Sequence, residues 1–112
     1  MRSMQKRLKE FYRKFNDLPC DVLHYKRQSK YPYVVWTEQG EDGSESFHGD
    51  NHKGEQVIIG VVDYFTRTEF DPTVDAIQTI LDESEKVAWT LDAVQYEDET
   101  NLIHYTWAWR LL

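Results

Sequence analysis

Three residues near the middle of the chain have the types and spacing of metal ligands. His48, Asp50 and His52 alternate along the sequence, so an extended backbone would place them on one side. Imidazole with carboxylate suits zinc or a similar divalent ion, but a catalytic zinc site also needs a third strong ligand and an open position. That ligand, Cys20 or His104, would have to arrive through folding. We therefore expect a polar loop whose side chains cap turns or contact a partner, and no metal.

A second arrangement that could do chemistry is a thiol nucleophile beside a histidine. Cys20 and His24 are four residues apart around an expected strand start, a spacing that does not direct the two side chains toward each other. The segments GEDG and HGDNHKG lack a phosphate-binding pattern. We expect no enzyme and no catalytic, cofactor-binding or metal-binding residues. The enzymatic alternative is a small metal-dependent hydrolase that uses His48, Asp50 and His52.

The composition predicts one small, soluble, acidic domain over residues 1–112. The chain has 20 Asp and Glu against 13 Lys and Arg, and its one cysteine, Cys20, has no internal disulfide partner. Small secreted domains usually carry several disulfides, so the cysteine count favours a reducing compartment. No apolar run reaches the roughly 18 to 20 residues of a membrane span, and the basic N-terminal segment lacks the apolar stretch of a signal peptide. We expect no membrane partner.

Charge is divided unevenly along the chain. Residues 1–30 contain nine basic and three acidic side chains, a net charge of +6, whereas residues 31–112 contain four and 17, a net charge of −13. Two charged poles would suit head-to-tail contact between copies or contact with an acidic neighbour. The alternative is a solvated helix face beside an ordinary acidic surface.

Hydrophobic residues recur at helical spacing through residues 1–16 and predict a basic amphipathic helix that ends before Pro19. The apolar stripe consists of Met4, Leu8, Phe11, Tyr12 and Phe15. Arg7 and Lys14 lie off this stripe, so we expect them to be exposed. A second helix is predicted at Pro72–Ser84, because Asp71 can cap the helix and proline suits its first position. Its core face would consist of Val74, Ile77, Ile80 and Leu81.

Strands are predicted at Val22–Lys26, Tyr33–Glu38, Gln56–Thr66, Ala88–Tyr96 and Ile103–Leu111. Gln56–Thr66 has apolar residues on both faces, which predicts a helix over each face, or one helix and a partner subunit. Trp107 and Trp109 share a face of the last strand and are expected in the core. The segment 38–55 is polar, interrupted by glycine and unusually long, so we predict a mobile loop that orders on assembly. The fold class is α+β, a largely antiparallel sheet packed with two helices in the order α-β-β-loop-β-α-β-β.

Four tracts together resemble a family of small phage and prophage proteins, the tail completion or tail terminator proteins of long-tailed phages. They are YVVW, GDNHKGEQ before an apolar strand, DYFTRTEFDP before the second helix, and QYEDET followed by IHY and W, within residues 31–110, about 70% of the chain. The resemblance implies a single tail-terminator-like domain that forms a hexameric ring on the end of the tail tube. The ring would terminate tail polymerisation and provide the head–tail joining surface.

The resemblance also implies the partners and the location. The partners would be other copies of the chain, the tail tube protein and a head completion or connector protein, without sequence-specific nucleic acid. The protein would be made in the bacterial host cytoplasm and reside in the virion tail or neck. Two alternatives stay open besides the hydrolase: a head-completion or neck adaptor protein, and an acidic non-structural binding module that occupies a basic DNA-binding surface. The family carries no catalytic residues to transfer.

Overall fold

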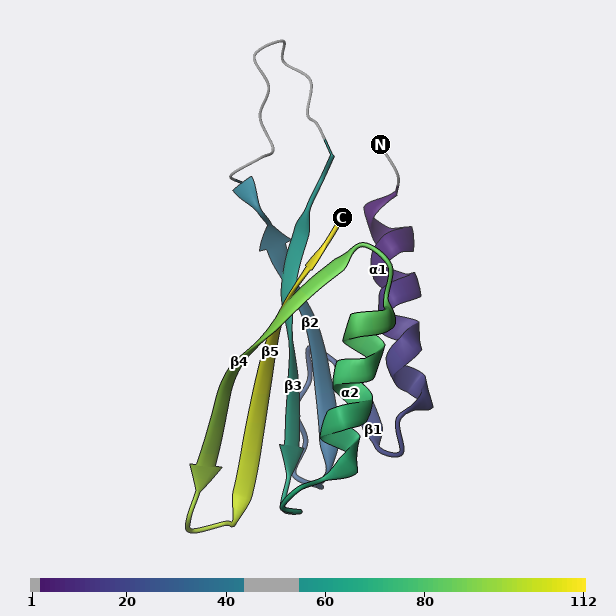
Figure 1. Ribbon diagram of the computed structural model, residues 1–112. Helices are drawn as coiled ribbons and strands as arrows, with labels where there is room; N and C mark the ends of the chain where they lie inside the picture. The colour runs from purple at the N-terminus through teal and green to yellow at the C-terminus, as the bar shows by residue number, and fades with distance from the viewer. Residues whose placement is uncertain (1–2, 44–54) are drawn as a thin grey trace.

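The computed structural model describes residues 3–43 and 55–112, and it shows the predicted α+β class with two helices and a five-stranded sheet (Figure 1). The helices are α1 (Met4–Arg13), extended by a 3₁₀ turn at Lys14–Asp17, and α2 (Pro72–Glu83). The strands are β1 (Asp21–His24), β2 (Tyr33–Glu41), β3 (Ile58–Thr66), β4 (Val87–Glu97) and β5 (Leu102–Leu111).

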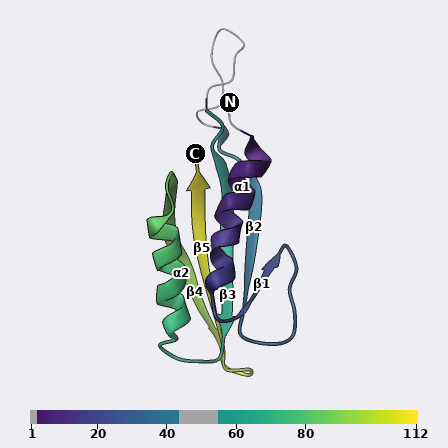
Figure 2. The same cartoon turned by 90° about the vertical axis from the view of Figure 1, so that its right-hand side faces the viewer.

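The strands are arranged in the order β1-β2-β3-β5-β4, so β1 and β4 form the two edges of the sheet. β1 pairs with β2 in parallel, and every other neighbouring pair is antiparallel. Both helices cover the same face of this sheet and run antiparallel to each other, with α1 toward β2 and α2 toward β4 (Figures 1 and 2).

The prediction that a helix covers each face of the third strand is therefore wrong. α1 leads into β1 and α2 connects β3 to β4 on one side, so no described helix covers the other face, which carries Ile59 and Val61. Alternating apolar residues show that both faces of a strand are apolar, but they do not show what covers them. The alternative of a partner subunit stays a prediction.

Helix α1 begins at a capping residue, because the hydroxyl of Ser3 accepts a hydrogen bond from the backbone N–H of Lys6. Its predicted apolar stripe is confirmed, and Leu8 and Phe11 are buried against the sheet. The expectation that Arg7 is exposed is wrong: only 6% of it is exposed. Its stem packs beside the core, and its guanidinium donates hydrogen bonds to the carbonyl oxygen (3.0 Å) and Oε1 (3.3 Å) of Gln56.

Helix α2 starts as predicted, with Asp71 as its cap and Pro72 in its first turn. One oxygen of Asp71 accepts a hydrogen bond from the backbone N–H of Thr73, and the other accepts from the hydroxyls of Tyr64 (2.6 Å) and Thr66 (2.7 Å) at the end of β3. Burial alone would raise the pKa of Asp71, but these hydrogen bonds outweigh it and hold the pKa below its ordinary value. Asp71 therefore joins the end of β3 to the start of α2.

Aromatic rings form the centre of the core between the helices and the sheet. Trp36 and Trp109 stack with ring centroids 5.1 Å apart, and Phe11 makes edge contacts with both rings. Trp107 and Trp109 are almost completely buried, which confirms them as core residues. Trp109 covers Gly60, where a Cβ atom would lie 2.2 Å from a ring carbon of Trp109. Only glycine allows this close approach.

The described part of the predicted 38–55 loop differs from the prediction at its beginning. β2 continues to Glu41, which pairs with Ile58, and a bulge between Glu38 and Gly40 lets the strand continue through this polar stretch. Polarity and glycine indicated a loop, but backbone pairing with β3 overrides that local preference. The remainder of the predicted loop, at positions 44–54, lies outside the described residues.

Candidate interaction surfaces

The metal-ligand pattern of His48, Asp50 and His52 lies outside the described residues. Within residues 3–43 and 55–112, no group of three or more His, Cys, Asp or Glu side chains could hold a metal ion, and this includes Cys20 and His104. The structure therefore brings no described residue to a metal site.

Cys20 and His24 do not form a nucleophilic pair. Burial, together with the charges of Asp21 and Asp71, raises the pKa of the Cys20 thiol to about 11, so the thiol is protonated near neutral pH. A cysteine nucleophile requires the thiolate. His24 is engaged elsewhere: its Nε2 lies 2.6 Å from a carboxylate oxygen of Glu38.

A polar cluster that the sequence analysis missed lies on the face of the sheet away from the helices. Oδ1 of Asp63 accepts a hydrogen bond from Thr106 (2.8 Å) and lies 2.7 Å from Nε2 of His104, which is also 3.3 Å from the Thr106 hydroxyl. A catalytic triad uses both ring nitrogens of the histidine, whereas Asp63 and Thr106 both meet the same nitrogen. Residues 41 positions or more apart give no local sequence signal, although the strand register would bring them together.

The same face carries a small aromatic cluster, which lines a pocket of about 370 Å³ together with His104. Tyr33 and Phe65 are stacked and almost fully buried. The segment between β1 and β2 covers them, and the guanidinium of Arg27 lies 5.1 Å above the Phe65 ring. The rings of Tyr33 and Phe65 are thus largely covered within the chain, and they form part of the wall of this pocket.

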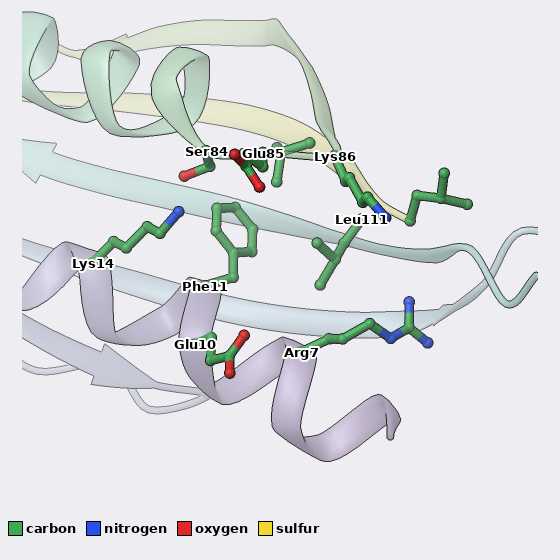
Figure 3. A pocket seen from close by; sticks show the side chains of 10 residues that line it. Arg7, Glu10, Phe11, Lys14, Ser84, Glu85, Lys86 and Leu111 are labelled. Carbon is green, nitrogen blue, oxygen red and sulfur yellow. The ribbon is translucent and has the colours of Figure 1, made fainter. Parts of the chain in front are cut away.

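A pocket of about 290 Å³ lies between α1 and the segment after α2, with Phe11 in its lining (Figure 3). Glu10 and Lys14 reach it from α1, while Glu85 and Lys86 reach it from the other side. Arg7 also lines the pocket, so its side chains include three cations and two carboxylates.

The edge at β4 presents apolar side chains to solvent. Leu91, Val94 and Tyr96 are 43%, 53% and 58% exposed. Leu91 is paired with the core residue Trp107, so this row lies on the helix side of the sheet. The surrounding chain is acidic: residues 69–101 contain ten carboxylates and one lysine, a net charge of −9.

The opposite edge, at β1, is basic. Residues 3–30, which include α1 and β1, contain eight basic and three acidic side chains, a net charge of +5. The exposed cations of α1 and of the 3₁₀ turn that follows it are Lys6, Lys9, Arg13 and Lys14. Of the two charged segments predicted from the sequence, the basic one contains the edge strand β1, and the acidic one extends from β2 to the opposite edge strand, β4 (Figure 2).

Comparison of the chain with protein-family models and with curated proteins gives no match. No helix in the described part of the chain is long and apolar enough to cross a membrane. The surfaces are therefore interpreted from their own chemistry.

Proposed function

We propose that this protein is a structural component of a long-tailed phage that caps the end of the tail tube as a ring. In this role it terminates tail polymerisation and provides the surface to which the head joins. The observation that carries the proposal is the pair of oppositely charged sheet edges, basic at α1 and β1 and acidic at α2 and β4. The sequence resemblance to tail terminator proteins supplies the biological setting.

Two different surfaces of one molecule that bind each other generate a head-to-tail assembly. Such contacts produce a closed ring when the rotation between neighbours divides a full turn, and a filament when it does not. A hexamer is the ring size that the resemblance implies. Opposite charges fix the direction of the contact and speed encounter, while buried apolar area supplies most of the affinity.

The described clusters of polar side chains agree with a structural role. Asp71 caps α2, and Asp63 pairs with His104 and Thr106 across neighbouring strands. Each cluster thus satisfies hydrogen-bonding groups of the fold. The proposed partners are other copies of the chain, the tail tube protein and a head completion or connector protein, in the tail or neck of the virion.

An acidic binding module that occupies a basic DNA-binding surface is the second candidate, and the acidic α2–β4 edge favours it. A head-completion or neck adaptor would use the same edges. The modes of action differ in what they bind: a terminator binds the end of a tail tube, an adaptor binds the head, and the acidic module binds its target as a monomer or dimer.

Negative-stain microscopy of the purified chain with tail tubes that lack their terminal protein tests the proposal. We expect one additional ring at one end of each tube, and tubes that no longer elongate when tube protein is added. A chain that stays monomeric at high concentration and also fails to bind tube ends contradicts the proposal. Binding to tail-less heads instead would favour the adaptor.

A further inference from the structure

The helix side of β4 is an apolar surface that the described chain leaves uncovered. We call it the β4 shelf; it consists of Trp89, Leu91, Val94 and Tyr96 together with the adjoining outer side of α2. A groove of about 460 Å³ runs along α2 at this point. The groove lining contains Asp75, Asp82 and Glu83 and no basic side chain.

Exposed apolar side chains on a long edge strand favour association with another chain, and monomeric proteins usually protect such strands from pairing. β4 has 11 residues and contains no proline, and its only basic neighbour in the strand region is Lys86, just before Val87. A bulge between Leu91 and Ala93 disturbs its regular pairing with β5. The side chains on the shelf nevertheless stay exposed, so this surface is suited to a partner.

The charge around the shelf requires a basic partner, and the chain itself carries one on its other edge. Lys6, Lys9 and Arg13 follow helical spacing on the side of α1 opposite its buried stripe, and we call them the α1 stripe. None of the three side chains forms an ion pair or hydrogen bond with another residue in the parts of the chain that the structure describes.

The two charged sets also match in length. Lys6 and Arg13 are seven residues apart along α1, and Asp75 and Asp82 are seven apart along α2, so each pair spans about 10.5 Å of helix. Within one chain α1 and α2 run antiparallel over the sheet (Figure 1). In a ring, the α1 of the next copy would lie along the far side of α2, with its cations near these carboxylates.

We propose that the β4 shelf of one copy binds the α1 stripe of a second copy. This inference rests on the proposed ring and specifies its contact. The aliphatic stems of the α1 stripe cover the apolar row of Leu91, Val94 and Tyr96, and the charges set the orientation of the helix. Because the exposed charges are screened over about 8 Å at physiological salt, higher salt weakens the contact and the apolar part persists.

Two charge-reversed variants of the full chain test the contact. The stripe variant combines Lys9→Glu with Arg13→Glu, and the shelf variant combines Asp75→Lys with Asp82→Lys; all four positions are exposed. The matched controls reverse as many charges elsewhere, with Lys26→Glu and Lys30→Glu, and with Asp98→Lys and Glu99→Lys. Sedimentation velocity measures assembly in solution, and microscopy measures it on tail tube ends.

Each test variant alone places like charges in the contact, and we expect assembly to weaken about 100-fold, whereas the controls change it much less. An equimolar mixture of the two variants restores opposite charges at both kinds of contact, so we expect assembly to return. This recovery also shows that both variants are folded. Three results overturn the inference: test variants that assemble like the wild type, controls that lose assembly equally, or a mixture that does not recover. If the wild type still caps tubes in those cases, the proposed function stands; if the wild type neither assembles nor caps tubes, both fail.

Discussion

The two edge strands of the sheet, β1 and β4, differ greatly in length and in how far their side chains are exposed. β1 has only four residues, and α1 lies beside it, with the hydroxyl of Tyr12 donating to the carbonyl of Val22. β4 has 11 residues, most of them exposed, and it carries three large apolar side chains in solvent. The chain thus packs α1 beside one edge strand, whereas it leaves three large apolar side chains of the other edge strand exposed.

The interior follows the same division. Two tryptophan rings, Trp36 and Trp109, stack beneath α1 and meet Phe11 of that helix. Toward the tip of the β4–β5 hairpin, the helix side of the sheet carries Val94 and Tyr96 with no described helix above them. Side chains beneath α1 should therefore govern folding, whereas side chains on β4 should govern assembly.

The largest expected effect is that of Trp109→Ala, which should lower the free energy of unfolding by about 3–5 kcal/mol because it leaves a cavity among stacked rings. Leu91→Ala on β4 is the control and should change it by less than about 1 kcal/mol while weakening assembly. Urea denaturation followed by tryptophan fluorescence measures the free energy of unfolding of both variants, and sedimentation velocity measures assembly. If the Trp109 variant keeps the wild-type stability yet fails to assemble, Trp109 belongs to an interface instead of the core.

Gly60→Ala should lower the free energy of unfolding by a smaller amount, about 1–3 kcal/mol. The added Cβ would lie 2.2 Å from both the Trp109 ring and the carbonyl oxygen of Thr37. Gly43→Ala is the matched control, since among the described residues other than its chain neighbours no atom lies within 4 Å of its added Cβ. Thermal unfolding measured by circular dichroism compares the two. Equal melting temperatures for the two variants would show that β3 can move away from Trp109 at little cost.

The next effect depends on pH. Asp71 has a lowered pKa in the fold, so its charge contributes stability above its unfolded pKa of about 3.9, and this contribution is lost as the pH falls through the folded pKa. Asp71→Asn should lower the free energy of unfolding by about 1–2 kcal/mol at neutral pH and by progressively less below about pH 4. Urea denaturation across this range measures the difference, with the exposed Asp82→Asn as control. A cost that stays constant down to about pH 2 would contradict this assignment.

The last prediction concerns the reactivity of Cys20, which precedes the edge strand β1. With its pKa raised to about 11, its thiol should react with iodoacetamide at pH 7.4 at least about 100-fold more slowly than in the urea-unfolded chain. Loss of free thiol over time measures the rate. Equal rates in the folded and unfolded chain would revive the nucleophile interpretation of Cys20 and His24.

Features that depend on neighbours along the chain were predictable from the sequence. The apolar stripe of α1, the Asp71-Pro72 start of α2 and the alternation around Trp107 and Trp109 all follow from local spacing, and the structure confirms them. Arg7 was misassigned because its burial depends on Gln56, a residue 49 positions away. Position on a helical wheel does not reveal such a partner.

Features that depend on how elements pack were not predictable in the same way. Both helices occupy one face, which alternation in β3 could not show, and the tight contact of Gly60 with Trp109 exists only after β3 and β5 pair. The charge partition was visible in the sequence. The strand order, which the sequence did not show, places β1 of the basic segment and β4 of the acidic segment at opposite edges.

Sedimentation velocity of the wild-type chain, alone and with tail tubes, tests the central claim most directly, namely that the two unlike edges bind each other in neighbouring copies. We predict one closed assembly whose mass does not grow with concentration, a hexamer by resemblance, and which loses subunits gradually between about 0.05 M and about 0.5 M salt. The same species should cosediment with the tubes. A chain that remains monomeric at every concentration and stays free of the tubes would contradict the account.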